Sequence, residues 1–148
     1  NFWKLVERHT ATFIITVPTA VAALMQRPVD ADVSSVRSAI SGSAPLPLEL
    51  FRRFYDATGV EIMEGYGLTE ATCLVSCNPY QGEKKVGSVG IPLPYTHVRI
   101  LDHGGETPVD VGPNGVGEIC MKIAISGRAT WGVWMKTDIF GSQAARRI

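Results

Sequence analysis

The chain has 148 residues, of which 45% are hydrophobic and 19% are charged. This apolar content excludes a globally disordered chain, because disordered chains have too few apolar side chains to form a core. The 14 basic and 14 acidic residues give a formal net charge of zero, so no strong global field attracts nucleic acid or an anionic membrane.

In the first half, segments rich in β-branched and aromatic residues alternate with segments of helical periodicity. The first eight residues have a helical pattern and lack an initial Met, so we expect the natural protein to begin further upstream. Strands are predicted at residues 12–17, 36–41 and 60–63. Helices are predicted to follow Pro18 and Pro47, the second of them ending at Gly59. This alternation favours an α/β fold with a parallel sheet and crossover helices.

The second half has a different character. Glycine and proline punctuate the chain from Gly82 onward, and strands are predicted at residues 96–101 and 118–125. Short strands joined by Gly-rich turns indicate an antiparallel, barrel-like unit. We therefore divide the chain into an α/β portion over residues 1–80, a barrel-like portion over 81–125 and a divergent tail over 126–148.

The cysteines and the longest apolar stretch indicate the cellular compartment in which the protein is expected. Three cysteines are too few for a disulfide framework, which indicates a reducing environment. Cys73 and Cys77 lie four positions apart with no histidine nearby, so a zinc site is not expected. The apolar-rich residues 13–25 form too short a stretch to cross a bilayer. These observations predict a cytoplasmic protein without a transmembrane segment.

The segment Glu64-Gly65-Tyr66-Gly67-Leu68-Thr69-Glu70 is the densest group of unusual residues, and it follows the third predicted strand. Glycines on either side of Tyr66 let the backbone pass close to a flat ligand, on which the ring is free to stack. The hydroxyl of Thr69 suits a phosphate, and the carboxylate of Glu70 suits its Mg²⁺. The alternative is a Gly-rich turn that binds no ligand.

A second unusual segment, Ser41-Gly42-Ser43-Ala44-Pro45-Leu46-Pro47, follows the second predicted strand. Parallel strands of an open α/β sheet end at the same edge, where their loops form ligand crevices. We therefore predict that Tyr66 and the loop Ser43-Ala44-Pro45 face one another across a flat slot. The alternative is a simple link between a strand and a helix.

Five segments of the chain resemble, in order and spacing, motifs of the AMP-forming adenylating superfamily. They are Val17-Pro18-Thr19, residues 41–47, residues 64–70, residues 87–94 and Gly117-Glu118-Ile119. The superfamily includes acyl-CoA synthetases, peptide-synthetase adenylation domains and luciferases. The run from Tyr66 to Cys73 most resembles fatty or related acyl-CoA synthetases. The implied fold is part of the large domain of such an enzyme: part of a parallel sheet with crossover helices, followed by part of an antiparallel β-barrel-like subdomain.

The resemblance implies an adenine site built from both segments. Tyr66 would stack on the adenine ring, with the 43–45 loop on the ring's opposite side. The residues that would contact the nucleotide are Ser43, Ala44, Pro45, Glu64, Gly65, Tyr66, Thr69 and Asp138. Asp138 would bind the ribose hydroxyls, because residues 134–138 resemble the superfamily's Trp-x-x-Thr-Gly-Asp without its glycine.

The resemblance also implies where the reacting groups lie. Thr69 and Glu70 would be the catalytic residues, with Thr69 contacting the α-phosphate of ATP and Glu70 holding Mg²⁺. Gly42 and Gly67 would lie beside the acyl carbonyl, where only small residues fit.

The implied reaction joins a carboxylic acid, in particular a fatty acid, to ATP, giving an acyl-adenylate and pyrophosphate, and CoA then attacks the acyl-adenylate. The superfamily's phosphate loop would lie upstream of this chain and its C-terminal lysine domain downstream, so we expect the chain alone to be inactive. Two alternatives remain open. One is a non-catalytic remnant of such an enzyme, and the other is an adenylation domain that loads a carrier-protein thiol in place of CoA.

Overall fold

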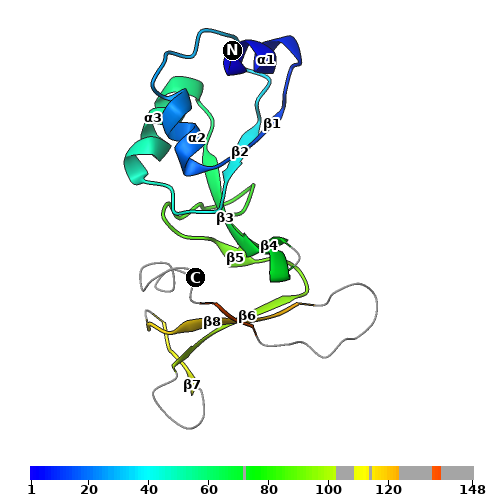
Figure 1. The fold of residues 1–148 in the computed structure, drawn as a ribbon, viewed down its shortest axis with the longest axis vertical. Coiled ribbons are helices and arrows are strands. Elements are labelled where there is room, and N and C mark those ends of the chain that lie inside the picture. Colours follow the sequence, from blue (N-terminus) through cyan, green and yellow to red (C-terminus); the bar gives the residue numbers. More distant parts are fainter. Residues whose placement is uncertain (72, 103–108, 114, 124–134, 138–148) are drawn as a thin grey trace.

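The computed structural model describes residues 1–71, 73–102, 109–113, 115–123 and 135–137 (Figure 1). Its helices are α1 (Phe2–Arg8), α2 (Pro18–Leu24), α3 (Leu48–Thr58) and the one-turn 3₁₀ helix η1 (Thr69–Ala71). Its strands are β1 (Phe13–Thr16), β2 (Ser38–Ser41), β3 (Ile62–Leu68), β4 (Cys73–Cys77), β5 (Ile91–Pro92), β6 (Thr96–Asp102), β7 (Val109–Asp110), β8 (Glu118–Ile123) and β9 (Met135–Thr137).

The strands form two sheets. The first has the order β1-β2-β3-β4-β5, in which β1, β2 and β3 are parallel, while β4 and β5 add to β3 in antiparallel fashion. The second has the order β7-β6-β8-β9 and is antiparallel throughout. Figure 1 shows the helices beside the first sheet and the second sheet at the other end of the molecule. The predicted α/β class, with a parallel sheet and a separate antiparallel sheet, is confirmed.

Both crossover helices begin close to the predicted residues, and α3 also ends where predicted. Pro18 occupies the first position of α2, where its fixed φ suits a helix and its missing N–H costs no hydrogen bond. Helix α3 follows Pro47 and ends at Gly59, whose φ of +69° is left-handed. The Gly59 N–H donates to the Tyr55 carbonyl at 2.7 Å, which satisfies one of the last carbonyls of the helix.

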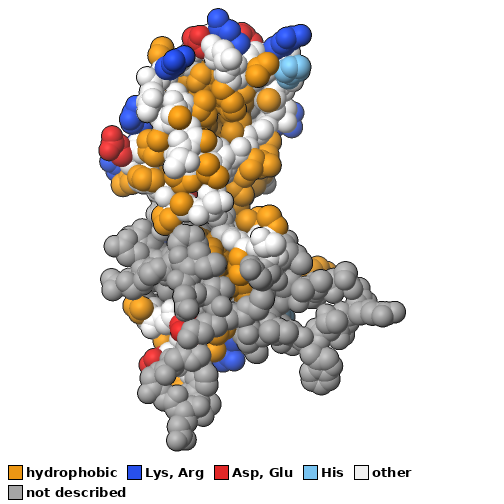
Figure 2. Space-filling view, in the orientation of Figure 1, with side chains coloured by type: hydrophobic (Ala, Val, Ile, Leu, Met, Phe, Trp, Pro, Cys, Tyr) orange, Lys and Arg blue, Asp and Glu red, His pale blue; other side chains and the backbone are white. Residues whose placement is uncertain are grey.

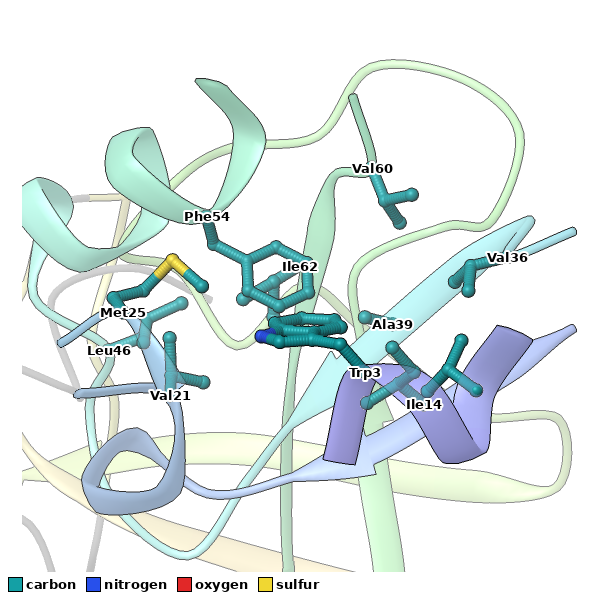
Figure 3. Packing of buried hydrophobic residues seen from close by; sticks show 11 residues of the cluster. Trp3, Ile14, Val21, Met25, Val36, Ala39, Leu46, Phe54, Val60 and Ile62 are labelled. Carbon is teal, nitrogen blue, oxygen red and sulfur yellow. The ribbon is translucent and has the colours of Figure 1, made fainter. Parts of the chain in front are cut away.

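A hydrophobic core packs the helices against one face of the first sheet (Figure 3). Ile14, Ala39 and Ile62 lie side by side on β1, β2 and β3, and all three are buried. Trp3 of α1 and Phe54 of α3 pack in the same cluster, with ring centroids 6.2 Å apart. Burying a large apolar side chain provides about 1.5–3 kcal/mol. This core therefore holds the three parallel strands and their helices together.

The opposite face of the first sheet carries apolar side chains that the described residues leave exposed. Along β1, buried Ile14 alternates with Phe13 and Ile15, and Ile15 is 80% exposed. Figure 2 shows apolar side chains across the α/β part, with charged side chains at its outer end, where Figure 1 marks the N-terminus, and along its sides. The sheet thus has one face that its own helices cover and one that they do not.

A second apolar cluster joins the two sheets. It contains Tyr66 of β3 and Val75 of β4 together with Ile119 and Met121 of β8. Val75 and Met121 are fully buried. The end of β3 that carries the Tyr66 segment is therefore packed against the antiparallel sheet.

The structure differs from the sequence prediction at three places. Strand β3 continues to Leu68, through the segment that was expected to follow the strand, because β4 provides a hydrogen-bonding partner along it. Strand β4 forms where the sequence predicts no strand, and β5 carries the first sheet beyond residue 80. The division at residues 80 and 125 stays a prediction. Of the expected divergent tail, the structure describes residues 135–137, which pair with β8 as β9.

The longest helix in the part of the chain that the structure describes is α3, with 11 residues. Within that part, no helix has the length and apolar character that crossing a membrane requires.

Candidate functional site

The two segments singled out in the sequence lie side by side at the carboxyl ends of β2 and β3. Ser41 is the register partner of Glu64 in the parallel ladder. The backbones approach closely just beyond this pair, because a Cβ placed on Gly42 would lie 3.4 Å from the main-chain oxygen of Gly65. The Gly42 N–H also donates to the Thr16 carbonyl of β1 at 3.3 Å. The carboxyl ends of β1 and β2 therefore meet β3 where the parallel ladder stops, and ligand crevices of α/β sheets form beside such strand ends.

The loop that leaves β2 presents its small residues to solvent. Ser43, Ala44 and Pro45 are all exposed. Ser43 has a φ of +68°, a left-handed backbone conformation that non-glycine residues seldom adopt. Leu46, directly after them, is buried in the helix-side core. The loop is thus anchored at Leu46 and open over the three residues predicted to contact a nucleotide.

Tyr66 does not present the freely exposed ring that the sequence predicts. Its side chain is 3% exposed and belongs to the cluster between the two sheets. The residue sits in the middle of a hydrogen-bonded strand, so its ring direction is set by the strand's alternation rather than by a loose turn. A stacking role for Tyr66 stays a prediction, and it requires the ring to become accessible when a nucleotide binds.

Glycines 65 and 67 lie in crowded surroundings. A Cβ on Gly65 would lie 3.1 Å from the Cδ1 atoms of both Ile40 and Leu74. A Cβ on Gly67 would lie 1.6 Å from the main-chain oxygen of Cys73, at the point where the β3–β4 register shifts. The backbone contacts explain Gly67 without any ligand, whereas the side chains beside Gly65 could shift by a few tenths of an ångström. The expected place of Gly42 and Gly67 beside an acyl carbonyl stays a prediction.

The predicted catalytic residues lie at the turn between β3 and β4. Thr69 and Glu70 belong to η1, and Thr69 is exposed. No group of three or more His, Cys, Asp or Glu among the described residues could hold a metal ion by itself. Mg²⁺ commonly takes one or two protein carboxylates and completes its shell with water and substrate phosphates. The expected role of Glu70 as a Mg²⁺ ligand stays a prediction. Asp138, the predicted ribose ligand, lies outside the described residues.

Two buried polar residues near the site take part in contacts that sequence reasoning did not foresee. Glu64, which is expected to contact the nucleotide, is 7% exposed, and its carboxylate accepts hydrogen bonds from the main-chain N–H groups of Leu46 and Gly87. Asn78, directly after β4, is buried and bonds to the segment that follows it. The dipeptide Asn78-Pro79 is a turn signal, and it is the sequence feature that could have drawn attention to Asn78.

The three cysteines should differ in reactivity, with Cys73 alkylated first. Cys73 is exposed, Cys77 is half-buried and Cys120 is buried. Burial raises the pKa of the Cys77 thiol, which lowers its share of the reactive thiolate at neutral pH. Timed labelling with iodoacetamide and peptide mass spectrometry would give this order. Equal rates in urea would serve as the control, and faster labelling of Cys120 in buffer would contradict the arrangement.

The chain is similar to curated CoA ligases. It is 43% identical over 109 residues to the marinolic acid–CoA ligase of Pseudoalteromonas sp. (strain SANK 73390), a match that covers 72% of this chain and 17% of that protein. It is 37% identical over 121 residues to the long-chain-fatty-acid–CoA ligase of Bacillus subtilis (strain 168), covering 80% of this chain and 21% of that protein. The chain therefore spans about a fifth of the length of these relatives.

Solved structures and a family model agree with these relatives. ATP-bound MatB from Rhodopseudomonas palustris aligns with a TM-score of 0.72 at 34% identity, covering 82% of this chain and 24% of that one. The anthranilate CoA ligase AuaEII in complex with anthranoyl-AMP aligns with a TM-score of 0.74 at 28% identity, covering 83% and 23%. The family model described as AMP-binding enzyme matches residues 1–127. That match takes in the first sheet, strands β6, β7 and β8 of the second sheet and both candidate segments, and the chain belongs to the family of AMP-binding enzymes.

Proposed function

We propose that this chain is part of a cytoplasmic, AMP-forming acyl-CoA synthetase that activates a fatty or related carboxylic acid with ATP and transfers it to CoA. The observation that carries the proposal is the meeting of the two candidate segments at one sheet edge, where Gly42 approaches Gly65. The CoA ligases among the relatives support the same reaction class.

In this proposal the exposed 43–45 loop forms one wall of the nucleotide site and β3 forms the other. Gly65 brings the backbone of β3 close to the edge of a flat base, and Tyr66 stacks on that base once its ring is accessible. The hydroxyl of Thr69 donates a hydrogen bond to the α-phosphate, and Asp138 binds the ribose hydroxyls. Ser43 and Ala44 in the exposed loop are small, which leaves room for a planar heterocycle.

Glu70 is the proposed Mg²⁺ ligand, and η1 places it directly after β3. A bound Mg²⁺ would supply charge neutralisation on the phosphate oxygens. The protein's own part is to orient the phosphates toward the incoming carboxylate, which is a positional rather than a covalent contribution.

The proposal predicts that the chain binds AMP at the loop after β2. NMR titration of the chain with AMP should shift the amide signals of residues 43–44 and Gly65, and GMP at the same concentration should shift them less. Ala44→Trp should weaken AMP binding by about tenfold or more, equivalent to about 1.4 kcal/mol, because the bulky ring occupies the exposed wall. The absence of any AMP-dependent shift at this edge would refute the assignment.

Ala57→Trp is the matched control, because Ala57 is also exposed but lies on α3, away from the two segments. It should leave AMP binding unchanged. In the longer protein that contains this chain, parallel assays with CoA and with a carrier-protein thiol would then identify the acceptor. Product formed only on the carrier protein would replace CoA in the proposal.

A further inference from the structure

The buried carboxylate of Glu64 bridges two segments that are far apart in the sequence. Its Oε1 accepts a hydrogen bond from the Gly87 N–H at 2.7 Å, and its Oε2 accepts one from the Leu46 N–H at 3.1 Å. The main-chain oxygen of Glu64 accepts a third bond, from the Asn78 N–H at 3.0 Å. One residue of β3 thus contacts the loop after β2, the end of β4 and the segment before β5.

Asn78 continues this connection into the segment before β5. Its Nδ2 donates to the Ser88 carbonyl at 2.6 Å, and its Oδ1 accepts from the Lys85 N–H at 3.2 Å. At the start of the same segment, Lys84 pairs with Glu61 at 2.9 Å. Residues 83–90 contain no helix or strand, so side chains of β3 and its surroundings provide much of what holds them in place.

The chemistry of the bridge requires a carboxylate. An ionised carboxylate is purely an acceptor, and it can meet one N–H with each oxygen. A glutamine has one acceptor oxygen, and its NH₂ group would face the second N–H, donor against donor. Hydrogen bonds to a charged acceptor are also stronger than those between neutral groups. Glu64 is therefore matched to two converging main-chain donors.

We propose that Glu64 is a positioning residue, which fixes the 43–45 loop through Leu46 and the 83–90 segment through Gly87, rather than a direct contact of the nucleotide. The functional consequence rests on the proposed function: by holding the 43–45 loop in position, Glu64 keeps one wall of the adenine site in place. Both carboxylate oxygens are directed to groups of the chain itself.

The test is amide hydrogen exchange, which needs no nucleotide. In the wild-type chain, the amides of Leu46 and Gly87 should exchange about 100-fold more slowly than that of exposed Ser43, because a buried carboxylate holds them. Glu64→Gln should speed exchange at Leu46, Gly87 or both by about tenfold or more relative to Ala39 in the central strand β2. Glu49→Gln, an exposed change of the same chemistry on α3, should alter neither.

Fast exchange of both amides in the wild-type chain would overturn the proposal, and this result does not depend on whether a variant folds. An equal increase at Ala39, Leu46 and Gly87 in Glu64→Gln would overturn it too, because it would mean a loss of global stability only. A second measurement uses AMP: Glu64→Gln should raise its dissociation constant by about tenfold, whereas Glu49→Gln should not. If the wild-type chain binds no AMP, the proposed function fails, and the exchange data still decide the role of Glu64.

Discussion

Replacing Glu70 with Gln in the longer enzyme that contains this chain should lower adenylation by about 10²–10³-fold while leaving the fold intact. The residue lies in η1, at the turn after β3. The substitution removes a negative charge from the proposed Mg²⁺ ligand and keeps the size of the side chain. The measurement is pyrophosphate release with ATP, Mg²⁺ and a panel of fatty and aromatic acids.

The Mg²⁺ dependence of the same assay separates a ligand from a structural residue. If Glu70 holds the ion, Glu70→Gln should need a higher Mg²⁺ concentration for half-maximal rate, and its thermal unfolding midpoint should match that of the wild type. Glu49→Gln provides the control, since Glu49 is an exposed acid on α3. Unchanged pyrophosphate release in Glu70→Gln would remove Glu70 from the catalytic residues.

The parallel half of the first sheet was predictable because local signals and packing agree there. The β-branched run around Ile14 favours a strand, and Pro18 and Gly59 mark a helix start and a helix end by backbone geometry alone. Each of these signals concerns a residue and its near neighbours. The core of Trp3, Phe54 and Ile62 then reinforces the same arrangement.

The extension of β3 and the presence of β4 were not predictable in this way. Glycines 65 and 67 lower the strand propensity of the segment, so its pattern suggests a turn. The strand forms because β4 pairs with it and because the missing Cβ of Gly67 allows Cys73 to approach. Pairing with β4 overrides the local propensity of this segment. The extension of β3 therefore depends on a tertiary contact that the local sequence pattern does not reveal.

The candidate site shows the same division. The meeting of the two candidate segments followed from the rule that parallel strands end at one edge, and the close approach of Gly42 to Gly65 agrees with that rule. The burial of Tyr66 and the bridge from Glu64 to Gly87 depend on residues that are distant in the sequence. Local sequence patterns do not encode contacts between distant residues. The partners of these two side chains could therefore be identified only from the structure.

Gly90 lies where the 83–90 segment meets the first sheet, and it should tolerate no side chain. Its φ of +78° is left-handed, which costs a residue with a Cβ about 1–2 kcal/mol. A Cβ there would also lie 2.1 Å from the main-chain carbon and oxygen of Cys77 and 2.2 Å from the Asn78 nitrogen. These neighbours are backbone atoms of and beside β4, which cannot move without disturbing the ladder to β3 and β5.

Urea unfolding of three glycine-to-alanine variants would separate the cost of the left-handed backbone from the cost of the steric overlap. Gly112→Ala should change the free energy of unfolding by less than about 0.5 kcal/mol, because Gly112 is not left-handed and has open space around it. Gly59→Ala should cost about 1–2 kcal/mol, because its left-handed φ is its sole constraint. Gly90→Ala should cost about 2–5 kcal/mol, since overpacking adds to the same backbone strain. A cost for Gly90→Ala no larger than that of Gly59→Ala would mean that the segment before β5 is not held against Cys77, and the bridge from Glu64 to Gly87 would lose its anchor.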